Sequence, residues 1–398
     1  MRTKVGFLVL LVLLFSEFSI QSAEIPSQRF ALDLTLTRET IIKPEGLGFS
    51  MKILPGNGSA EVVFHADQPY AVQLETGTVE SFIISGTREI KTSLPARFSI
   101  FSPGRVIHSV GGRGIQNGCF LNPTYLTRDK LGRIYVSDTG NDRVQVFDQS
   151  GSFVSQFGSF GVATDIASSE NEIFNSGSLA RFNHPEGIAV ATEIFIADRE
   201  NHRIVKFDRF GNMLRFFGKY GNGRNEFDTP LDLALDDQKN LYVVDSENHR
   251  LKKYDSNGYL LLKIGNYGQA PGQFIRPCSI AAADQSLFVI DSGNHRLQKF
   301  DENGGFQAQG QFPDNFGTGR GVSIFESLIL LTVRDRIAVF DKCLHLIGEF
   351  PIPDCGELFG IIQNGDFLVV TDNSQGHLLY LLPGFASIKL SPEAKAPG

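Results

Sequence analysis

Carboxylate, amide, imidazole and guanidinium side chains recur together in the middle of this 398-residue chain. Four aspartates, Asp138, Asp198, Asp245 and Asp291, are each followed by Asn three residues later and by Arg five residues later. Histidine stands between the Asn and the Arg at positions 202, 249 and 295. Carboxylates and imidazoles can bind metals or transfer protons, whereas a carboxylate beside a guanidinium forms an ion pair. Because an active site rarely needs four copies of one residue, the repetition favours a structural role, in which Asp, Asn and Arg hold a loop and bridge neighbouring units.

The elements that must position these residues are short strands. The aspartates lie 60, 47 and 46 residues apart, and each ends a β-rich run such as residues 194–198. A proline followed by alternating apolar residues precedes each run, and an alternating segment and a glycine turn follow it. Four strands per 40 to 50 residues are typical of a propeller blade. The aromatic residues fall on one phase of the alternation, which predicts that many of the 34 Phe pack between blades.

The repeated segment resembles the NHL repeat. The match is nearly verbatim in the Asn-His-Arg triplets at 201–203, 248–250 and 294–296, and it drifts to Asn-Asp-Arg at 141–143. Two degenerate units begin at Gly321 and Glu357, which makes six blades. Residues 105–112 match a fourth strand and are expected to complete the last blade. In the alternative of seven blades, residues 69–112 form an extra blade and 385–390 complete the sixth.

The predicted fold class is therefore all-β, a six-bladed or alternatively seven-bladed NHL β-propeller with a small β-rich N-terminal extension. The expected domains are a signal peptide over 1–23, a β-rich region over 24–104 and the propeller over 105–390. Within 24–104 we expect strands near 31–37, 48–54, 60–66, 70–75 and 79–85. In the seven-bladed alternative, 69–104 belongs to the extra blade.

The first residues predict export. Arg2 and Lys4 precede an apolar run over 5–15, which as a helix is about 16 Å long and so covers roughly half of a hydrocarbon core. This order of segments is typical of a secretory signal peptide. We expect a secreted or lumenal protein with no other membrane span and with Asn57 as the glycosylation acceptor. The alternatives are an uncleaved anchor, or a cytoplasmic protein if the start is mis-assigned.

Composition excludes several classes of protein. The net charge of −7 provides no general basic field for nucleic acid or anionic lipid, and four cysteines are too few for a disulfide-dense scaffold. Their spacing around the predicted ring leaves all four thiols unpaired and mostly buried.

An enzyme is the less favoured class. The resemblance also includes one lyase with an NHL-type propeller, which holds zinc through histidines that directly follow prolines. In this chain the residues that directly follow the corresponding prolines are not histidines but Thr124, Glu186, Leu231 and Cys278. Glu186 and Asp232 are expected to face the channel, and two carboxylates are too few for a calcium site. We therefore expect no catalytic residues, no metal and no cofactor. The enzymatic alternative is a metal-dependent lyase or hydrolase in the channel.

Binding is the favoured function, because the resemblance implies a loop face that contacts protein or RNA. A protein partner is expected, with RNA as the alternative, and the chain is expected to be a monomer. Arg and Tyr are enriched in protein interfaces. The residues expected to contact the partner are Arg199, Arg203, Lys219, Tyr220, Arg224, Arg250, Tyr267, Arg276 and Arg296.

Overall fold

The computed structural model describes residues 29–36, 40–42, 49–56, 59–76, 79–162, 180–313, 317–325, 327–365 and 367–392. The predicted signal peptide and Asn57 lie outside these residues. The chain divides into two compact units. A terminal unit comprises Met1–Glu80, Ile84–Ile100 and Phe385–Gly398, and a propeller unit comprises Ser81–Ile83 and Phe101–Gly384. Within the described part of the chain, we find no helix that is both long and apolar enough to cross a membrane.

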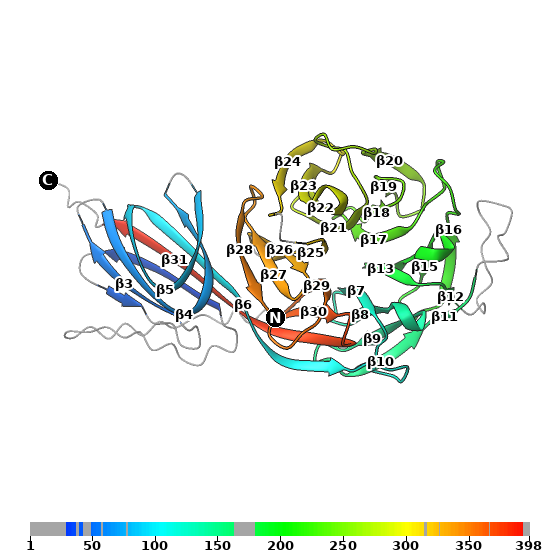
Figure 1. Cartoon of the computed structure of the whole chain (residues 1–398), viewed down its shortest axis with the longest axis horizontal. Coiled ribbons are helices and arrows are strands. Elements are labelled where there is room, and N and C mark those ends of the chain that lie inside the picture. Colours follow the sequence, from blue (N-terminus) through cyan, green and yellow to red (C-terminus); the bar gives the residue numbers. More distant parts are fainter. Residues whose placement is uncertain are drawn as a thin grey trace, which may run out of the picture. The chain divides into compact units, whose positions relative to one another are not determined.

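The propeller unit has six four-stranded blades around a central axis (Figure 1). Five of them are separate antiparallel sheets, and the strands of the sixth are part of a nine-stranded sheet. The first three blades are β7 (Pro123–Arg128), β8 (Ile134–Asp138), β9 (Arg143–Phe147) and β10 (Phe153–Phe157); β13 (Pro185–Val190), β14 (Ile194–Asp198), β15 (Arg203–Phe207) and β16 (Met213–Phe217); and β17 (Pro230–Leu235), β18 (Leu241–Asp245), β19 (Arg250–Tyr254) and β20 (Leu260–Ile264). The other three are β21 (Pro277–Ala283), β22 (Ser286–Asp291), β23 (Arg296–Asp301) and β24 (Phe306–Gln311); β25 (Gly319–Phe325), β26 (Leu328–Val333), β27 (Arg336–Phe340) and β28 (Leu346–Pro351); and β29 (Leu358–Asn364), β30 (Phe367–Asp372), β31 (His377–Pro392) and β6 (Ala96–Gly111).

The sixth blade closes the ring with a strand from the other end of the chain. Its order is β6-β31-β30-β29, so the outermost strand precedes the first blade in sequence. The predicted six-bladed propeller is confirmed, and the seven-bladed alternative is wrong, because residues 69–75 and 79–93 lie in two long strands, β4 and β5, that pair with each other outside the blades. Closure in this way pairs the strand edges that an open ring would expose.

Aromatic and aliphatic side chains fill the space between blades, as the alternation predicted. One cluster combines Tyr135 and Val146 of the first blade with Ile194 and Phe207 of the second. In the described residues, four linker phenylalanines are fully buried at successive junctions: Phe120, Phe182, Phe227 and Phe274. The blades are thus held to one another mainly by apolar contact.

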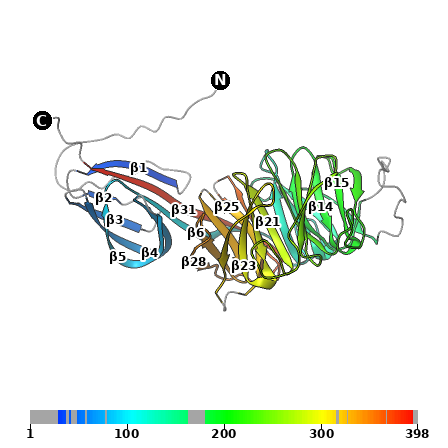
Figure 2. The ribbon, with the colours of Figure 1, turned by 90° about the horizontal axis from the view of Figure 1, so that it is seen from above.

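The terminal unit is also built of strands. It contains β1 (Arg29–Leu36), β2 (Thr40–Ile42), β3 (Phe49–Pro55), β4 (Ser59–Glu75), most of β5 (Val79–Ser93) and parts of β6 and β31. β1 runs parallel to β31, beside which it lies in Figure 2. The two strands predicted near 60–66 and 70–75 are one continuous strand, β4.

Candidate functional site

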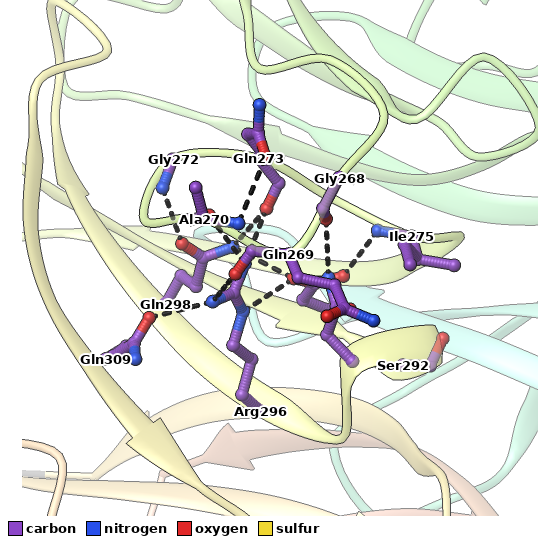
Figure 3. Close-up of polar contacts among 12 residues, drawn as sticks. Gly268, Gln269, Ala270, Gly272, Gln273, Ile275, Ser292, Arg296, Gln298 and Gln309 are labelled. Atoms are coloured by element: carbon purple, nitrogen blue, oxygen red, sulfur yellow. Dashed lines mark hydrogen bonds and ion pairs between the residues drawn. The ribbon is translucent and has the colours of Figure 1, made fainter.

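The repeat aspartate is the centre of a buried hydrogen-bond network in each of the first four blades. In the fourth blade, Asp291 is fully buried, and its Oδ1 accepts a hydrogen bond from the Ile275 amide at 2.8 Å. Its Oδ2 accepts from Asn294 Nδ2 at 2.8 Å, Arg296 Nε at 2.8 Å and Gln298 Nε2 at 3.0 Å. Figure 3 shows this network with Arg296 and Gln298 at its centre. A buried carboxylate is stable only when it is paired and hydrogen-bonded in this way.

The bonds from Asn and Arg to the repeat aspartate recur in the other three NHL-like repeats, whereas a glutamine like Gln298 is present only in the first, as Gln145. The carboxylates of Asp138, Asp198 and Asp245 accept from the Nε of the arginine five residues later at 2.6, 2.8 and 2.8 Å. All three carboxylates are fully buried. Burial raises the pKa of Asp198 and Asp245, against the lowering effect of their arginine partners. The repeated residues therefore have the structural role that their repetition predicted.

The arginine and asparagine of each repeat also hold the linker that enters the blade. Arg296 donates to the carbonyl oxygens of Gln269, Ala270 and Gln273 at 2.8 to 2.9 Å. Asn294 Nδ2 donates to Gly268 O at 2.9 Å. The corresponding asparagines of the first three blades bond the carbonyl oxygens of Gly114, Gly161 and Gly221 at 2.8 to 3.0 Å. Each network thus acts as a clamp on one linker.

Each clamped glycine ends a four-residue segment that presents one side chain to solvent. In the fourth blade the segment is Gly265-Asn266-Tyr267-Gly268. Gly265 has φ +80°, and a Cβ there would overlap the ring of the buried Phe274. Tyr267 forms an isolated parallel bridge with Phe274, while its own side chain is 65% exposed. The backbone of this segment is therefore fixed, although its third residue projects outward.

Four linkers share this design, and we call their third residues the displayed positions. They are Arg113, Phe160, Tyr220 and Tyr267. The three aromatic ones are 59%, 67% and 65% exposed. They lie on what we call the loop face, the face that carries the turns between second and third strands and the linkers between blades.

The repeat histidines support this arrangement. The ring of His202 lies 4.9 Å from that of Tyr220, and the ring of His249 lies 5.0 Å from that of Tyr267. Nδ1 of each histidine accepts from the backbone amide of the next linker, at Thr229 (3.3 Å) and Arg276 (3.1 Å). In the first blade Asp142 stands in place of histidine, and its Oδ1 accepts from the His184 amide at 2.8 Å. The second residue of the triplet therefore needs to be an acceptor, which explains the drift to Asp.

The predicted contact residues divide into two groups. Arg203 and Arg296 are only 7% and 3% exposed, and the Arg250 side chain is 12% exposed. These three guanidiniums bond their own aspartates and linker carbonyls. They are therefore not on the surface, although the sequence analysis expected them there. The exposed members are Lys219, Tyr220, Arg224, Tyr267 and Arg276, with Arg199 part-exposed beside Glu186 and Glu200.

Phe160 is a displayed residue that the sequence prediction missed. The signal for it is present, since Gly158-Ser-Phe-Gly161 aligns with Gly218-Lys-Tyr-Gly221 and with the segment at 265–268. Aligning the glycines that flank the aromatic residue, rather than the Asn-His-Arg triplets, would have identified it.

Of the two channel carboxylates, Asp232 is engaged by a neighbouring blade and Glu186 by an arginine of its own blade. Asp232 Oδ2 accepts from the Ser279 hydroxyl at 2.6 Å and the Ile280 amide at 2.9 Å, and burial raises its pKa to about 7. Glu186 is 6% exposed and pairs with Arg199 at 3.3 Å. The hydroxyl of Tyr125, in the first blade, donates to Cys278 O in the fourth at 2.7 Å. The contacts of Asp232 and Tyr125 join innermost strands of different blades. Among the described residues, no three His, Cys, Asp or Glu side chains are grouped so that they could hold a metal ion.

All four cysteines are free. Cys278 is buried and Cys119 and Cys355 are part-buried, whereas Cys343 is exposed, unlike the mostly buried thiols that the sequence predicted.

Comparison with known proteins gives matches in the same part of the chain. The sequence model of the NHL repeat matches residues 120–147, 182–207 and 227–254. The chain is 27% identical over 155 residues to the B-box type zinc finger protein ncl-1 of Caenorhabditis elegans, which is 31% of this chain and 18% of that protein. It is 29% identical over 159 residues to Protein brain tumor of Drosophila melanogaster, which is 32% of this chain and 15% of that protein. The chain therefore spans less than a fifth of the length of these relatives.

Among solved structures, the gluconolactonase XC5397 of Xanthomonas campestris has a similar fold. The TM-score is 0.50 at 16% identity, and the match covers 71% of this chain and 95% of that one. At this level of identity the likeness concerns the propeller fold alone.

Proposed function

Because this chain is an NHL-repeat β-propeller protein, we propose that it is a non-catalytic binding scaffold whose loop face contacts a protein partner. The observation that carries the proposal is the series of displayed aromatic residues. Phe160, Tyr220 and Tyr267 occupy equivalent positions in three successive linkers, and each is more than half exposed. Large aromatic side chains held in water on a fixed backbone are typical of the anchor residues of protein interfaces.

The rigidity of the linkers supports this function. A side chain on a fixed backbone loses little backbone entropy when it binds, so more of its contact energy contributes to affinity. The clamps of Asp, Asn and Arg provide this rigidity without using the displayed side chains themselves. The repeat residues would thus serve binding indirectly, by positioning the displayed ones.

The charges of the loop face favour a protein over a nucleic acid. Two of the exposed cations have acidic neighbours, Lys219 with Glu226 at 3.6 Å and Arg276 with Glu247 at 3.2 Å. Nucleic acid binding relies on many cations that face phosphates, whereas this face has mixed charge. RNA is the second candidate, because exposed aromatic rings can stack on unpaired bases. Binding to an RNA pool that falls steeply with salt would favour RNA, and no binding at low salt would exclude it.

A photo-crosslinking experiment tests the proposed face. A benzophenone amino acid replaces Tyr220 or Tyr267 in the full chain, and lysate or conditioned medium of the source cells is irradiated. Tyr259 is the matched control, because it is 63% exposed but lies in the turn between β19 and β20 of the third blade, away from the loop face. We expect protein adducts from positions 220 and 267 and not from 259. Equal adducts at all three positions, or none at 220 and 267, would contradict the proposal.

We also propose that the protein is exported and acts as a monomer. The support for export is the leader-like sequence over residues 1–23. N-terminal sequencing of the natively produced chain tests the first part, with a mature terminus near Ser22 or Ala23 as the expected result. Light scattering tests the second, and a mass of twice 43.8 kDa or more would contradict it.

A further inference from the structure

An exposed phenylalanine occupies a turn where the other blades have smaller residues. Phe210 is 75% exposed and lies between β15 and β16. Its turn is fixed by Asp208, whose Oδ1 accepts from the amides of Phe210 at 2.8 Å and Asn212 at 2.9 Å. The equivalent residues of the first, third, fourth and fifth blades are Ser150, Asn257, Asn303 and Cys343. The turn itself therefore does not require a large apolar side chain at this position.

This turn lies at the junction between the first and second blades, which differs from the next junctions at one position of the third strand. The fourth position of the third strand is Val146 in the first blade, but Lys206, Lys253 and Lys299 in the next three. Each lysine places its ammonium over the aromatic residue opposite it on the second strand, at 4.9 to 5.7 Å from the ring centre. The residue opposite Val146 is Tyr135, and its ring is covered by the guanidinium of Arg133, at 5.8 Å, instead of by a lysine of the third strand.

Two of these lysines also close the junction with the following blade. Lys206 Nζ donates to Ser256 O at 3.1 Å, and Lys253 Nζ donates to Glu302 O at 3.2 Å. Ser256 and Glu302 each follow the aspartate of a turn, as Arg209 does in the second blade. Because valine is too short to reach Arg209, the corresponding space between the first and second blades stays open.

This space is a pocket of about 170 Å³. A cavity of about 150 Å³ holds one benzene molecule, so the pocket has room for a single ring or one side chain. Val146, Phe157 and Ile194 contribute an apolar wall. Its polar groups include Tyr135 and Ser155, which bear hydroxyls, and two guanidiniums, Arg133 and Arg209.

The two arginines give the pocket a positive character. Arg133 Nε bonds Asp129 at 2.7 Å, and the Arg133 guanidinium lies 5.8 Å from the centre of the Tyr135 ring. The guanidinium of Arg209 stacks on the Phe210 ring at 4.7 Å. Asp129 pairs with Arg133, and the oxygens of Asp208 accept hydrogen bonds from Phe210 and Asn212 of their own turn. The positive character of the pocket therefore comes mainly from the Arg209 guanidinium, whose fork matches a carboxylate or phosphate.

We propose that this pocket, on the face opposite the loop face, binds an anionic group carried on a short apolar or aromatic stem. The guanidiniums of Arg133 and Arg209 receive the carboxylate or phosphate, and the stem lies against Val146 and Phe157. Phe210 covers the entrance and provides contact area to whatever bears the group. The site is separate from the displayed positions and does not depend on their proposed function.

Ligand-observed NMR of the full chain with benzoate and phenyl phosphate tests the proposal. Benzamidine, which has the same ring and the opposite charge, is the matched probe. Val146→Lys is the principal variant, because the lysines at the two following junctions show that this residue fits there and would fill the pocket. Arg209→Glu tests the charge, and Arg224→Glu on the loop face is the control for the same change of net charge.

We expect saturation-transfer signals from the two anions and much weaker signals from benzamidine. Val146→Lys and Arg209→Glu are each expected to weaken anion binding at least tenfold, whereas Arg224→Glu leaves it unchanged. The proposal is overturned if neither anion binds, if benzamidine binds equally well, or if Val146→Lys with an unchanged melting temperature retains full binding. The stronger of the two anions shows whether the group is a carboxylate or a phosphate.

Discussion

Replacing Lys252 by glutamine should stabilise the propeller, and the gain should shrink as the pH rises. Lys252 is fully buried, and its Nζ donates to the carbonyl oxygens of Gly223 and Arg224 at 3.2 Å and to that of Glu226. The equivalent residues in the first and fourth blades are Gln145 and Gln298, each of which bonds a linker carbonyl and the repeat aspartate. The chain itself therefore shows that glutamine fits this network.

The size of the expected gain in stability follows from the pKa of Lys252. Burial lowers the pKa of Lys252 from 10.5 to about 8, although Asp245 lies 3.8 Å away and favours the charged form. At about 1.4 kcal/mol per pKa unit, the charged form is disfavoured in the folded chain by about 3 kcal/mol at pH 7. Because the folded pKa is the lower one, the folded chain loses its proton before the unfolded chain does. The wild type therefore gains stability between about pH 8 and pH 10.5.

The assay is thermal unfolding of the wild type and Lys252→Gln at several values between pH 7 and pH 9. The advantage of Lys252→Gln over the wild type in free energy of unfolding should fall by about 1 kcal/mol from pH 7 to pH 9. This corresponds to about 2 °C in melting temperature for a unit of this size. Lys239→Gln, at an exposed turn position of the same blade, controls for the loss of a lysine. A difference between Lys252→Gln and wild type that stays constant from pH 7 to pH 9 would refute the reasoning, because it would mean that Lys252 does not titrate there.

Three other changes test the clamps, the linkers and the channel. Asp291→Asn leaves Arg296 without its carboxylate and should lower the free energy of unfolding by about 3 kcal/mol, with faster amide exchange over 265–276; unchanged exchange there would contradict the clamp. Gly265→Ala should destabilise by more than 2 kcal/mol and clearly more than Gly118→Ala, because both glycines have φ near +80° but only at Gly265 does a Cβ meet a buried ring. Equal losses in urea unfolding would show that backbone strain alone decides. For Asp232, whose pKa burial raises to about 7, the wild type should lose stability relative to Asp232→Asn as the pH rises from about 4 to 7; an opposite trend in melting temperature would show that the Ser279 and Ile280 hydrogen bonds outweigh burial.

The blades could be predicted because each one repeats the same local signals. Proline begins the first strand, the aspartate ends the second and glycine marks the turn before the fourth, so the order and phase of the strands follow from the sequence. Closure by residues 105–112 was predictable for the same reason, since these residues match the fourth strands of other blades. The terminal unit has no repeat, and there the predicted strand ends were less accurate, as the continuous β4 shows.

The orientation of charged side chains was harder to predict. An arginine five residues after an aspartate could face solvent or its own carboxylate, and the sequence pattern is the same in both cases. Burial of Arg203 and Arg296 depends on the linker carbonyls that surround them, which come from residues more than 20 positions earlier. The pocket beside Val146 was missed because it arises from a residue that is unremarkable alone and differs only from its counterparts in the other blades.

The closing strand determines the order in which the ring can be completed during synthesis. β6 leaves the ribosome before any blade, but its partner β31 begins at His377, after all the other blade strands. The blades can form in turn through local contacts, whereas the last pairing must bring together two segments separated by almost the whole propeller, which is the slow kind of contact in folding. A nascent or truncated chain that stops before His377 would expose both β6 and the open side of β30 as unpaired edges. Such chains should aggregate or be recognised by chaperones, while the addition of one final strand removes both edges together.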